Sequence, residues 1–177
     1  MHMTILCRSL ALLAVLLGQC GVIAPVLAQV VEPGARVMTS NGLDIETIAE
    51  RRIVTPSADG AQIEFVPTGQ LHIGDEIFYT VRVRNATDND IDPVLVVKAI
   101  PHNTRLVADS VVGPATIVGF SIDGGSSFDA PDALSIATAP GIARRATSDD
   151  YTHIRWEMRH PLAAGATALL RFRGIFK

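Results

Sequence analysis

The sequence contains very little cysteine. Its only two cysteines, Cys7 and Cys20, both lie within the first 28 of 177 residues. If this segment is removed on export, the remaining chain has no thiol, which excludes disulfide bonds, thiol catalysis and thiolate metal ligands. Aromatic residues make up only 5% of the chain and its net charge is −3. Because nucleic acids are bound by basic surfaces, an acidic chain of this kind is not expected to bind them.

The sequence also lacks an uninterrupted apolar run of the ~20 residues that a membrane span requires. The apolar stretch Leu10–Leu17 follows a single charge, Arg8, and is followed by glycine and by Pro25. Val26-Leu27-Ala28 then provides residues suited to signal peptidase. We therefore expect residues 1–28 to be a signal peptide. The mature chain would then have no transmembrane segment and would lie in the periplasm, on the outer surface or outside the cell.

Cys20 raises the alternative of lipidation. Lipoprotein processing prefers a small residue directly before the modified cysteine, and Gln19 is not small. The sequence therefore favours plain cleavage after Ala28.

The pattern of the remaining chain is typical of an all-β protein. Residues 29–42 have no regular period and are expected to form a linker or arm, whereas residues 43–177 contain short alternating segments separated by Gly, Pro, Asn and Asp. The clearest predicted strand is Glu76–Asn85, in which apolar and polar residues alternate between the two faces. Further strands are expected at Leu43–Ile53, Val94–Ile100, Thr104–Val107, Ala115–Ile122, Ser126–Asp129, Leu134–Ala137, Tyr151–His160 and Ala166–Phe176.

An antiparallel β-sandwich would bury the apolar faces of these strands between two sheets. The residues expected in the shared core are Tyr79, Val81, Val83, Val96, Ile154, Trp156, Leu170 and Phe172.

Several segments resemble one bacterial family. The segment from Ile73-Gly74-Asp75 to Asn85 is similar to the opening of that family's repeat, with Ile73 where proline is usual. Lys98-Ala99-Ile100-Pro101 takes the place of the family's Asp-x-Leu-Pro, with lysine replacing the aspartate. The remaining similar segments are Ser121-Ile122-Asp123-Gly124-Gly125, Ile154-Arg155-Trp156 and Leu162-Ala163-Ala164-Gly165.

From about Ile45 to Lys177, the chain therefore resembles the bacterial surface-protein conserved repeat domain called domain of unknown function eleven. The Asp150–Trp156 segment resembles its short, single-copy proteobacterial type. The resemblance implies an immunoglobulin-like antiparallel β-sandwich at the cell envelope. It implies no catalytic residues.

Two groups of residues are candidates for ligand binding. Asp88, Asp90 and Asp92 place three carboxylates in one turn, and oxygen ligands of this kind suit calcium, although turns often contain aspartate for purely local reasons. Six arginines are expected on outward faces of three strands, where they would bind an acidic glycan or lipid headgroup if the strands are neighbours. These arginines are Arg82, Arg84, Arg155, Arg159, Arg171 and Arg173. The competing interpretation is a solvated face with ion pairs to Glu76 and Glu157.

Single residues give weaker signals. Lys98 lies in an apolar strand, and a side chain reaching solvent from a sheet edge is the favoured interpretation over a covalent lysine–asparagine cross-link. Asn85 is expected to bond backbone at a strand end rather than to be glycosylated. The four histidines outside the signal segment have no ligand-pair spacing, and no nucleophile–base pattern stands out.

We therefore expect a non-enzymatic envelope or surface module without a cofactor, acting through protein contact or structural assembly. The alternative is a module that binds acidic glycan, lipid headgroup or calcium. A hydrolase, the third class, would need a pocket that gathers a histidine and a carboxylate. The expected partners of the envelope module are other envelope or surface proteins, including a second copy of itself. Arg51 breaks the alternation of Leu43–Ile53, so this first strand either completes its own sheet, which is favoured, or adds to another copy.

Overall fold

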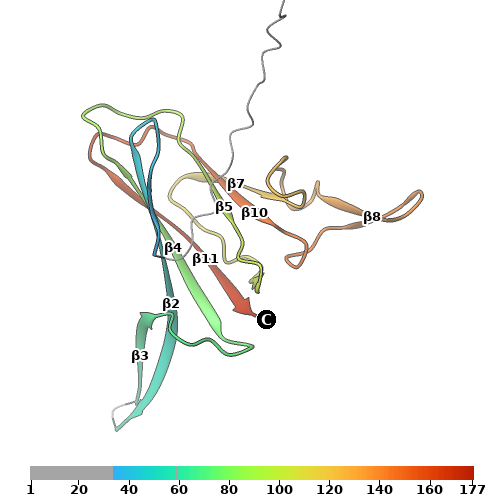
Figure 1. Ribbon diagram of the computed structural model, residues 1–177, viewed down its shortest axis with the longest axis horizontal. Helices are drawn as coiled ribbons and strands as arrows, with labels where there is room; N and C mark the ends of the chain where they lie inside the picture. Colours follow the sequence, from blue (N-terminus) through green and yellow to red (C-terminus); the bar gives the residue numbers. More distant parts are fainter. Residues whose placement is uncertain (1–33, 59) are drawn as a thin grey trace, which may run out of the picture.

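The computed structural model describes residues 34–58 and 60–177 (Figure 1). The predicted signal peptide, including Cys7 and Cys20, and residues 29–33 of the predicted arm lie outside the described residues. Within the part that is described, no helix has the length and apolar character needed to cross a membrane.

Two antiparallel sheets form the body of the protein. The larger has the strand order β1-β2-β4-β11-β6, and β3 also pairs with β2. Its strands are β1 (Arg36–Met38), β2 (Leu43–Ser57), β3 (Gly60–Pro67), β4 (Glu76–Asn85), β6 (Thr104–Leu106) and β11 (Thr167–Phe176). The smaller sheet has the order β5-β10-β7, with β5 (Leu95–Ala99), β7 (Thr116–Ser121) and β10 (His153–Met158). A separate hairpin joins β8 (Ser135–Ala139) to β9 (Ile142–Arg145).

The apolar faces of the two sheets meet in one core. Trp156 of the smaller sheet packs on Phe172 of the larger, with ring centroids 6.3 Å apart, and Phe172 stacks on Tyr79 at 4.5 Å. All eight residues predicted for the core are buried. The prediction of an all-β antiparallel sandwich is therefore confirmed.

Four connections cross between the two sheets: β4 to β5, β5 to β6, β6 to β7 and β10 to β11. The first and the last of them lie beside each other. The chain passes from β4 in the larger sheet to β5 in the smaller, and later from β10 in the smaller sheet back to β11 in the larger. Since β4 pairs with β11 and β5 pairs with β10, the two crossings lie against each other. The final strand therefore lies beside β4 and β6, in the opposite sheet from β10.

The first strand of the predicted domain completes its own sheet, as the sequence favoured. β2 pairs with β4 along one edge and with both β1 and β3 along the other. Its first half is therefore an interior strand and offers no free edge to another copy.

The prediction that residues 29–42 form an unpatterned arm is wrong for the described part. Arg36–Met38 is a strand whose residues pair with Asp44–Glu46 of β2. The turn between them uses Gly42 at φ +86°, which glycine adopts without a steric penalty. The Arg36 guanidinium donates hydrogen bonds to the Asp44 carboxylate, with Nε to Oδ1 at 2.6 Å, and this ion pair joins β1 to β2.

The pair between Arg36 and Asp44 predicts a pH-dependent stability. The hydrogen bond from Arg36 lowers the pKa of the Asp44 carboxyl group below its usual range, although burial opposes this. A carboxylate whose pKa is lower when folded adds stability above its unfolded pKa of about 3.9, and this contribution is lost as pH falls through the folded pKa. Asp44→Asn should therefore lower the free energy of unfolding at pH 7, and the deficit should shrink as pH falls below about 4. Urea titrations of both proteins from pH 7 to 3 measure this. Asp88→Asn, in an exposed loop, is the control, and an equal deficit for Asp44→Asn at both extremes would contradict the prediction.

The core contact of Trp156 predicts a large loss on truncation. Trp156→Ala removes a fully buried ring between the sheets and should lower the free energy of unfolding by about 3–5 kcal/mol. Ile117→Ala, on the outer side of β7 with half of its surface exposed, should change it by less than about 1 kcal/mol. Chemical denaturation measures both, and a loss below about 1 kcal/mol for Trp156→Ala would contradict the proposed packing.

Candidate interaction surface

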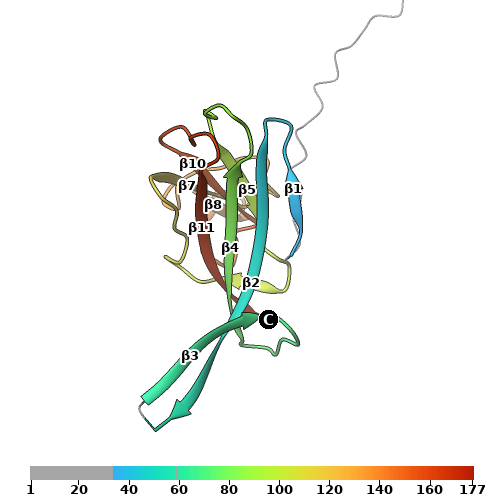
Figure 2. The same cartoon turned by 90° about the vertical axis from the view of Figure 1, so that its left-hand side faces the viewer.

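β2 extends beyond the sandwich and forms a projecting hairpin with β3. Figure 2 shows this hairpin leaving the body of the molecule at the end that also holds the C-terminus. Its pairing runs from Glu50 opposite Pro67 to Ser57 opposite Gly60 without a register shift. β2 pairs with β4 only as far as Arg51, so the part of the hairpin beyond this residue has no further strand beside it in the sheet.

The hairpin has one apolar face. In an antiparallel pair, residues directly opposite each other point to the same side. Val54 lies opposite Ile63, and Pro56 lies opposite Ala61. The exposed fractions are 51% for Val54, 55% for Ile63 and 48% for Phe65. We call the set Val54, Pro56, Ala61, Ile63, Phe65 and Pro67 the hairpin apolar face; Arg52, opposite Phe65, and Glu50, opposite Pro67, lie on the same side at its base. The other side of the hairpin is mixed and carries Ile53, Thr55, Gln62, Glu64 and Val66.

The hairpin apolar face continues onto the outer face of the larger sheet. The Phe65 ring meets the Phe78 ring of β4 edge to face, with centroids 5.1 Å apart and an interplanar angle of 82°. Phe78 is the apolar residue on the otherwise polar outer side of β4, and it lies opposite Glu50 of β2 and Arg173 of β11. Phe78 breaks the alternation of β4 because its ring contacts Phe65 outside the core.

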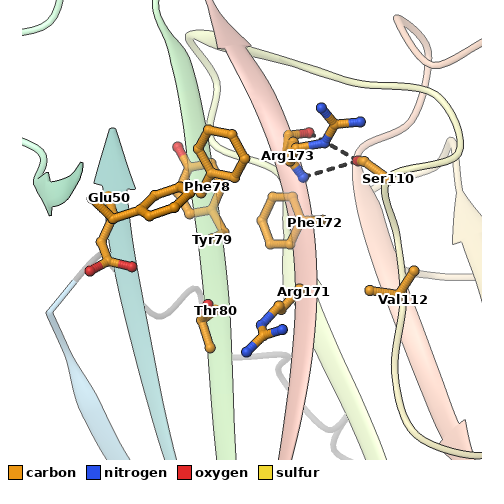
Figure 3. A pocket seen from close by; sticks show the side chains of 10 residues that line it. Glu50, Phe78, Tyr79, Thr80, Ser110, Val112, Arg171, Phe172 and Arg173 are labelled. Carbon is orange, nitrogen blue, oxygen red and sulfur yellow. Dashed lines mark hydrogen bonds between the residues drawn. The ribbon is translucent and has the colours of Figure 1, made fainter. Parts of the chain in front are cut away.

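A groove of about 430 Å³ lies beside this aromatic pair (Figure 3). Phe65 and Phe78 line one side of the groove, and Val112 and Arg171 line the other. Glu50 and Thr80 also belong to the lining. The far side is fixed because the backbones of Val112 and Arg171 exchange two hydrogen bonds of 2.9 Å. The backbone amide of Arg173 also donates to Ser110 Oγ at 3.0 Å. The groove therefore combines apolar groups, from the two phenylalanines and Val112, with the charged side chains of Glu50, Arg171 and Arg173.

The predicted arginine ladder over three strands does not form. Arg82 and Arg84 of β4 share the outer face of the larger sheet with Arg171 and Arg173 of β11, the adjacent strand. β10 instead pairs with β5 and β7 in the smaller sheet. Arg155 and Arg159 therefore belong to the opposite side of the molecule.

Several of these arginines already have partners. Arg82 lies 2.8 Å from a Glu46 carboxylate oxygen, and Arg173 Nη1 donates to Glu76 Oε1 at 2.8 Å. Arg155 lies over the Phe128 ring at 5.0 Å. The pairing with Glu76 is the one expected for a solvated face, so the arrangement favours cross-strand ion pairs over a polyanion site.

The acidic turn does not gather its carboxylates into a calcium site. Asp88, Asp90 and Asp92 are all exposed, and Asp90 accepts a hydrogen bond from the Ala164 amide at 3.1 Å. Among the described residues, no group of three or more His, Cys, Asp or Glu side chains is placed to hold a metal ion. The predicted calcium ligands are therefore not brought together.

The loop is organised by Asn85, as predicted. The buried side chain of Asn85 donates to the backbone oxygens of Asn89 at 2.7 Å and Leu162 at 2.9 Å. Its Oδ1 accepts from the amide and the hydroxyl of Thr87 at 2.9 and 2.7 Å. One amide therefore joins the loop after β4 to the turn before β11.

Lys98 is not a side chain that reaches solvent from a sheet edge. It is only 3% exposed and lies opposite the buried Ile154, on the inner side of β5. Lys98 borders a second pocket, of about 600 Å³, whose lining also includes Tyr79 and Thr104. Tyr79 Oη and Thr104 Oγ1 lie 3.5 Å apart there, and burial raises the pKa of the Tyr79 hydroxyl.

This second pocket also contains histidine and a carboxylate, which a hydrolase would require. His102, His153 and Asp149 are among its lining residues. His153 Nδ1 lies 3.2 Å from Thr152 Oγ1, and burial lowers the pKa of its imidazole. Over residues 34–58 and 60–177, neither histidine is in hydrogen-bonding or ion-pair contact with Asp149. The histidine–carboxylate pair that a hydrolase would require is therefore not assembled in the described part of this lining.

Comparison with known protein families, with curated proteins and with solved structures found no match for this chain.

The strand β3 is not among the strands predicted from the sequence. The available signal was the Asp59-Gly60 dipeptide between two segments with alternating apolar residues, which is typical of a β-hairpin. In these two segments the alternating apolar residues form an exposed face. Their pattern in the sequence therefore does not identify core positions.

The hydrogen bonds of Asn85 predict a specific stability loss. Asn85→Ala leaves buried backbone groups of the loop without partners, and should lower the free energy of unfolding by about 1–3 kcal/mol. Asn89→Ala, whose side chain is exposed and whose backbone oxygen is retained, should change it by less than about 0.5 kcal/mol. Equal losses for the two variants in urea denaturation would contradict the assigned role.

Proposed function

We propose that this protein is a non-enzymatic module of the bacterial cell envelope that acts by binding another protein. The observation that carries the proposal is the hairpin apolar face, which projects from the sandwich and continues onto the outer face of the larger sheet. Large exposed apolar side chains that form one continuous surface mark interaction sites in soluble proteins.

The hairpin supports this function because its exposed residues have no role in the core. Val54, Ile63 and Phe65 each keep about half of their surface exposed. Exposing such side chains to water is unfavourable, and a partner that covers them gains the corresponding free energy. The groove beside Phe78 extends the same surface and offers Arg171 and Glu50 for orienting a partner.

The envelope location rests on sequence features. The signal-peptide pattern of residues 1–28, the lack of later cysteine and the resemblance to a bacterial surface-repeat domain support it. The immunoglobulin-like type of the sandwich and the short, single-copy type of the domain belong to the same proposal.

Site-specific photo-cross-linking tests the proposed surface. A photoreactive benzoyl-phenylalanine is placed at Phe65 or at Leu95 in the full chain, expressed in cells of its own source organism. The two positions are matched, since Phe65 is 48% and Leu95 is 50% exposed, but Leu95 lies on the smaller sheet. The expected result is a discrete protein adduct at position 65, in the exported fraction, and none at position 95.

Two outcomes contradict the proposal. If position 65 yields no adduct, or the same adducts as position 95, the hairpin apolar face is not the contact surface. If the protein stays in the cytoplasmic fraction with residues 1–28 intact, the envelope location is wrong.

A further inference from the structure

We infer that the hairpin binds a second copy of this chain by antiparallel pairing of β3 with β3 across a two-fold axis. The inference rests on the proposed function and names its partner. It is drawn from the free edge of β3, from the order of residues along that strand and from the projection of the hairpin.

β3 offers the longest free strand edge in the described part of the chain. It has eight residues and pairs only with β2. The other terminal strands of the sheets are shorter, with three residues in β1 and β6 and five in β5. β7 is partly covered, because Phe120 and Asp129 exchange backbone hydrogen bonds of 2.8 and 3.0 Å.

β3 has few of the features that protect edge strands from pairing. Proteins block such edges with charged side chains (lysine above all), bulges, proline or very short strands. β3 contains no lysine or arginine and one charged residue, Glu64; its register with β2 is regular, and its proline is the last residue. The hairpin of β8 and β9 shows the contrast, since it has a register shift near Ala137 and carries Arg144 and Arg145.

We infer the symmetric register that is centred on Ile63 rather than the one centred on Glu64. If Ile63 lies opposite Ile63 of the second copy, Ala61 faces Phe65, and the two hairpin apolar faces join into one surface over four strands. On the other side, Gln62 then lies opposite Glu64 of the second copy, so that an amide faces a carboxylate twice. Moving the centre to Glu64 would set two carboxylates directly opposite each other, which is unfavourable.

The projection of the hairpin leaves room for this pairing. In Figures 1 and 2, β3 and the end of β2 stand clear of both sheets, so two bodies would lie apart while their hairpins pair. The contact is isologous, with the same surface used by both copies, and therefore closes at a dimer.

Single cysteines test the register. Ile63→Cys, Gln62→Cys and Glu64→Cys are each made in the full chain carrying Cys7→Ser and Cys20→Ser, so that the introduced thiol is the only one. The three positions are adjacent and exposed. With the inferred register, the two residues 63 face each other within disulfide reach, whereas residues 62 and residues 64 are each displaced by two positions along the strand. Mild oxidation should give a disulfide dimer for Ile63→Cys and essentially none for the other two.

Sedimentation velocity tests the association without cross-linking. The parent chain should show a concentration-dependent dimer, and Ile63→Lys should raise its dissociation constant at least about tenfold, because two like charges would face each other. At a concentration where both proteins are monomeric, the melting temperature should be unchanged, since Ile63 is largely exposed in the monomer. Gln62→Lys, on the opposite side of the strand and facing Glu64, is the matched charge control and should retain the dimer.

The outcomes separate this inference from the proposed function. A disulfide dimer formed preferentially at 62 or 64 overturns the inferred register. A parent chain that remains monomeric at millimolar concentration, with no dimer for Ile63→Cys, overturns self-pairing. In that case a photo-adduct at Phe65 with a different protein would still support the proposed function, whereas the loss of every adduct at Phe65 would remove both.

Discussion

The fold depends on the contact between Trp156 and Phe172. The two sheets of a sandwich share no backbone ladder, and the described part of this chain contains no cysteine to join them. Apart from the connections between strands, they are held by side-chain packing, with Trp156 from the smaller sheet against Phe172 and its stacked neighbour Tyr79 from the larger. The crossings from β4 to β5 and from β10 to β11 place these strands where the rings meet. Packing of this kind leaves the outer faces free to serve other purposes.

The core could be predicted from the sequence because burial imposes a periodic pattern. The alternation of Glu76–Asn85 gives the β4 strand with the same bounds in the structure. The alternation around Trp156 likewise places its strand and its inward face. Strand order is different in kind, since it depends on which strands meet in three dimensions. The prediction for Arg155 failed for this reason: its outward direction follows from alternation, but its sheet does not.

The candidate surface could be predicted less well, because exposed apolar residues and buried ones have the same pattern in a sequence. Ile63 and Phe65 alternate with polar residues as core strands do, yet they face solvent. Lys98 shows the reverse case, a charged residue that its neighbours place on an inward face. The short strand β1 was missed because its three residues depend on the Arg36–Asp44 pair, a contact between residues eight positions apart that has no periodic signature.

β2 runs without a break from the sandwich into the hairpin, so the backbone amides of its two halves are expected to exchange with solvent by different openings. Near Leu43 and Thr47 the strand is buried, and opening of its amides to solvent would require the sheet itself to unfold. Beyond Ile53 the same strand pairs only with β3, and its amides exchange with solvent whenever the two-stranded ribbon frays. Hydrogen exchange along this single strand would therefore change from global to local opening within a few residues. An isolated ribbon has little stability of its own. A partner that covers the hairpin would consequently slow amide exchange most in the part of β2 beyond Ile53. It would leave exchange in the buried first half of β2 unaffected.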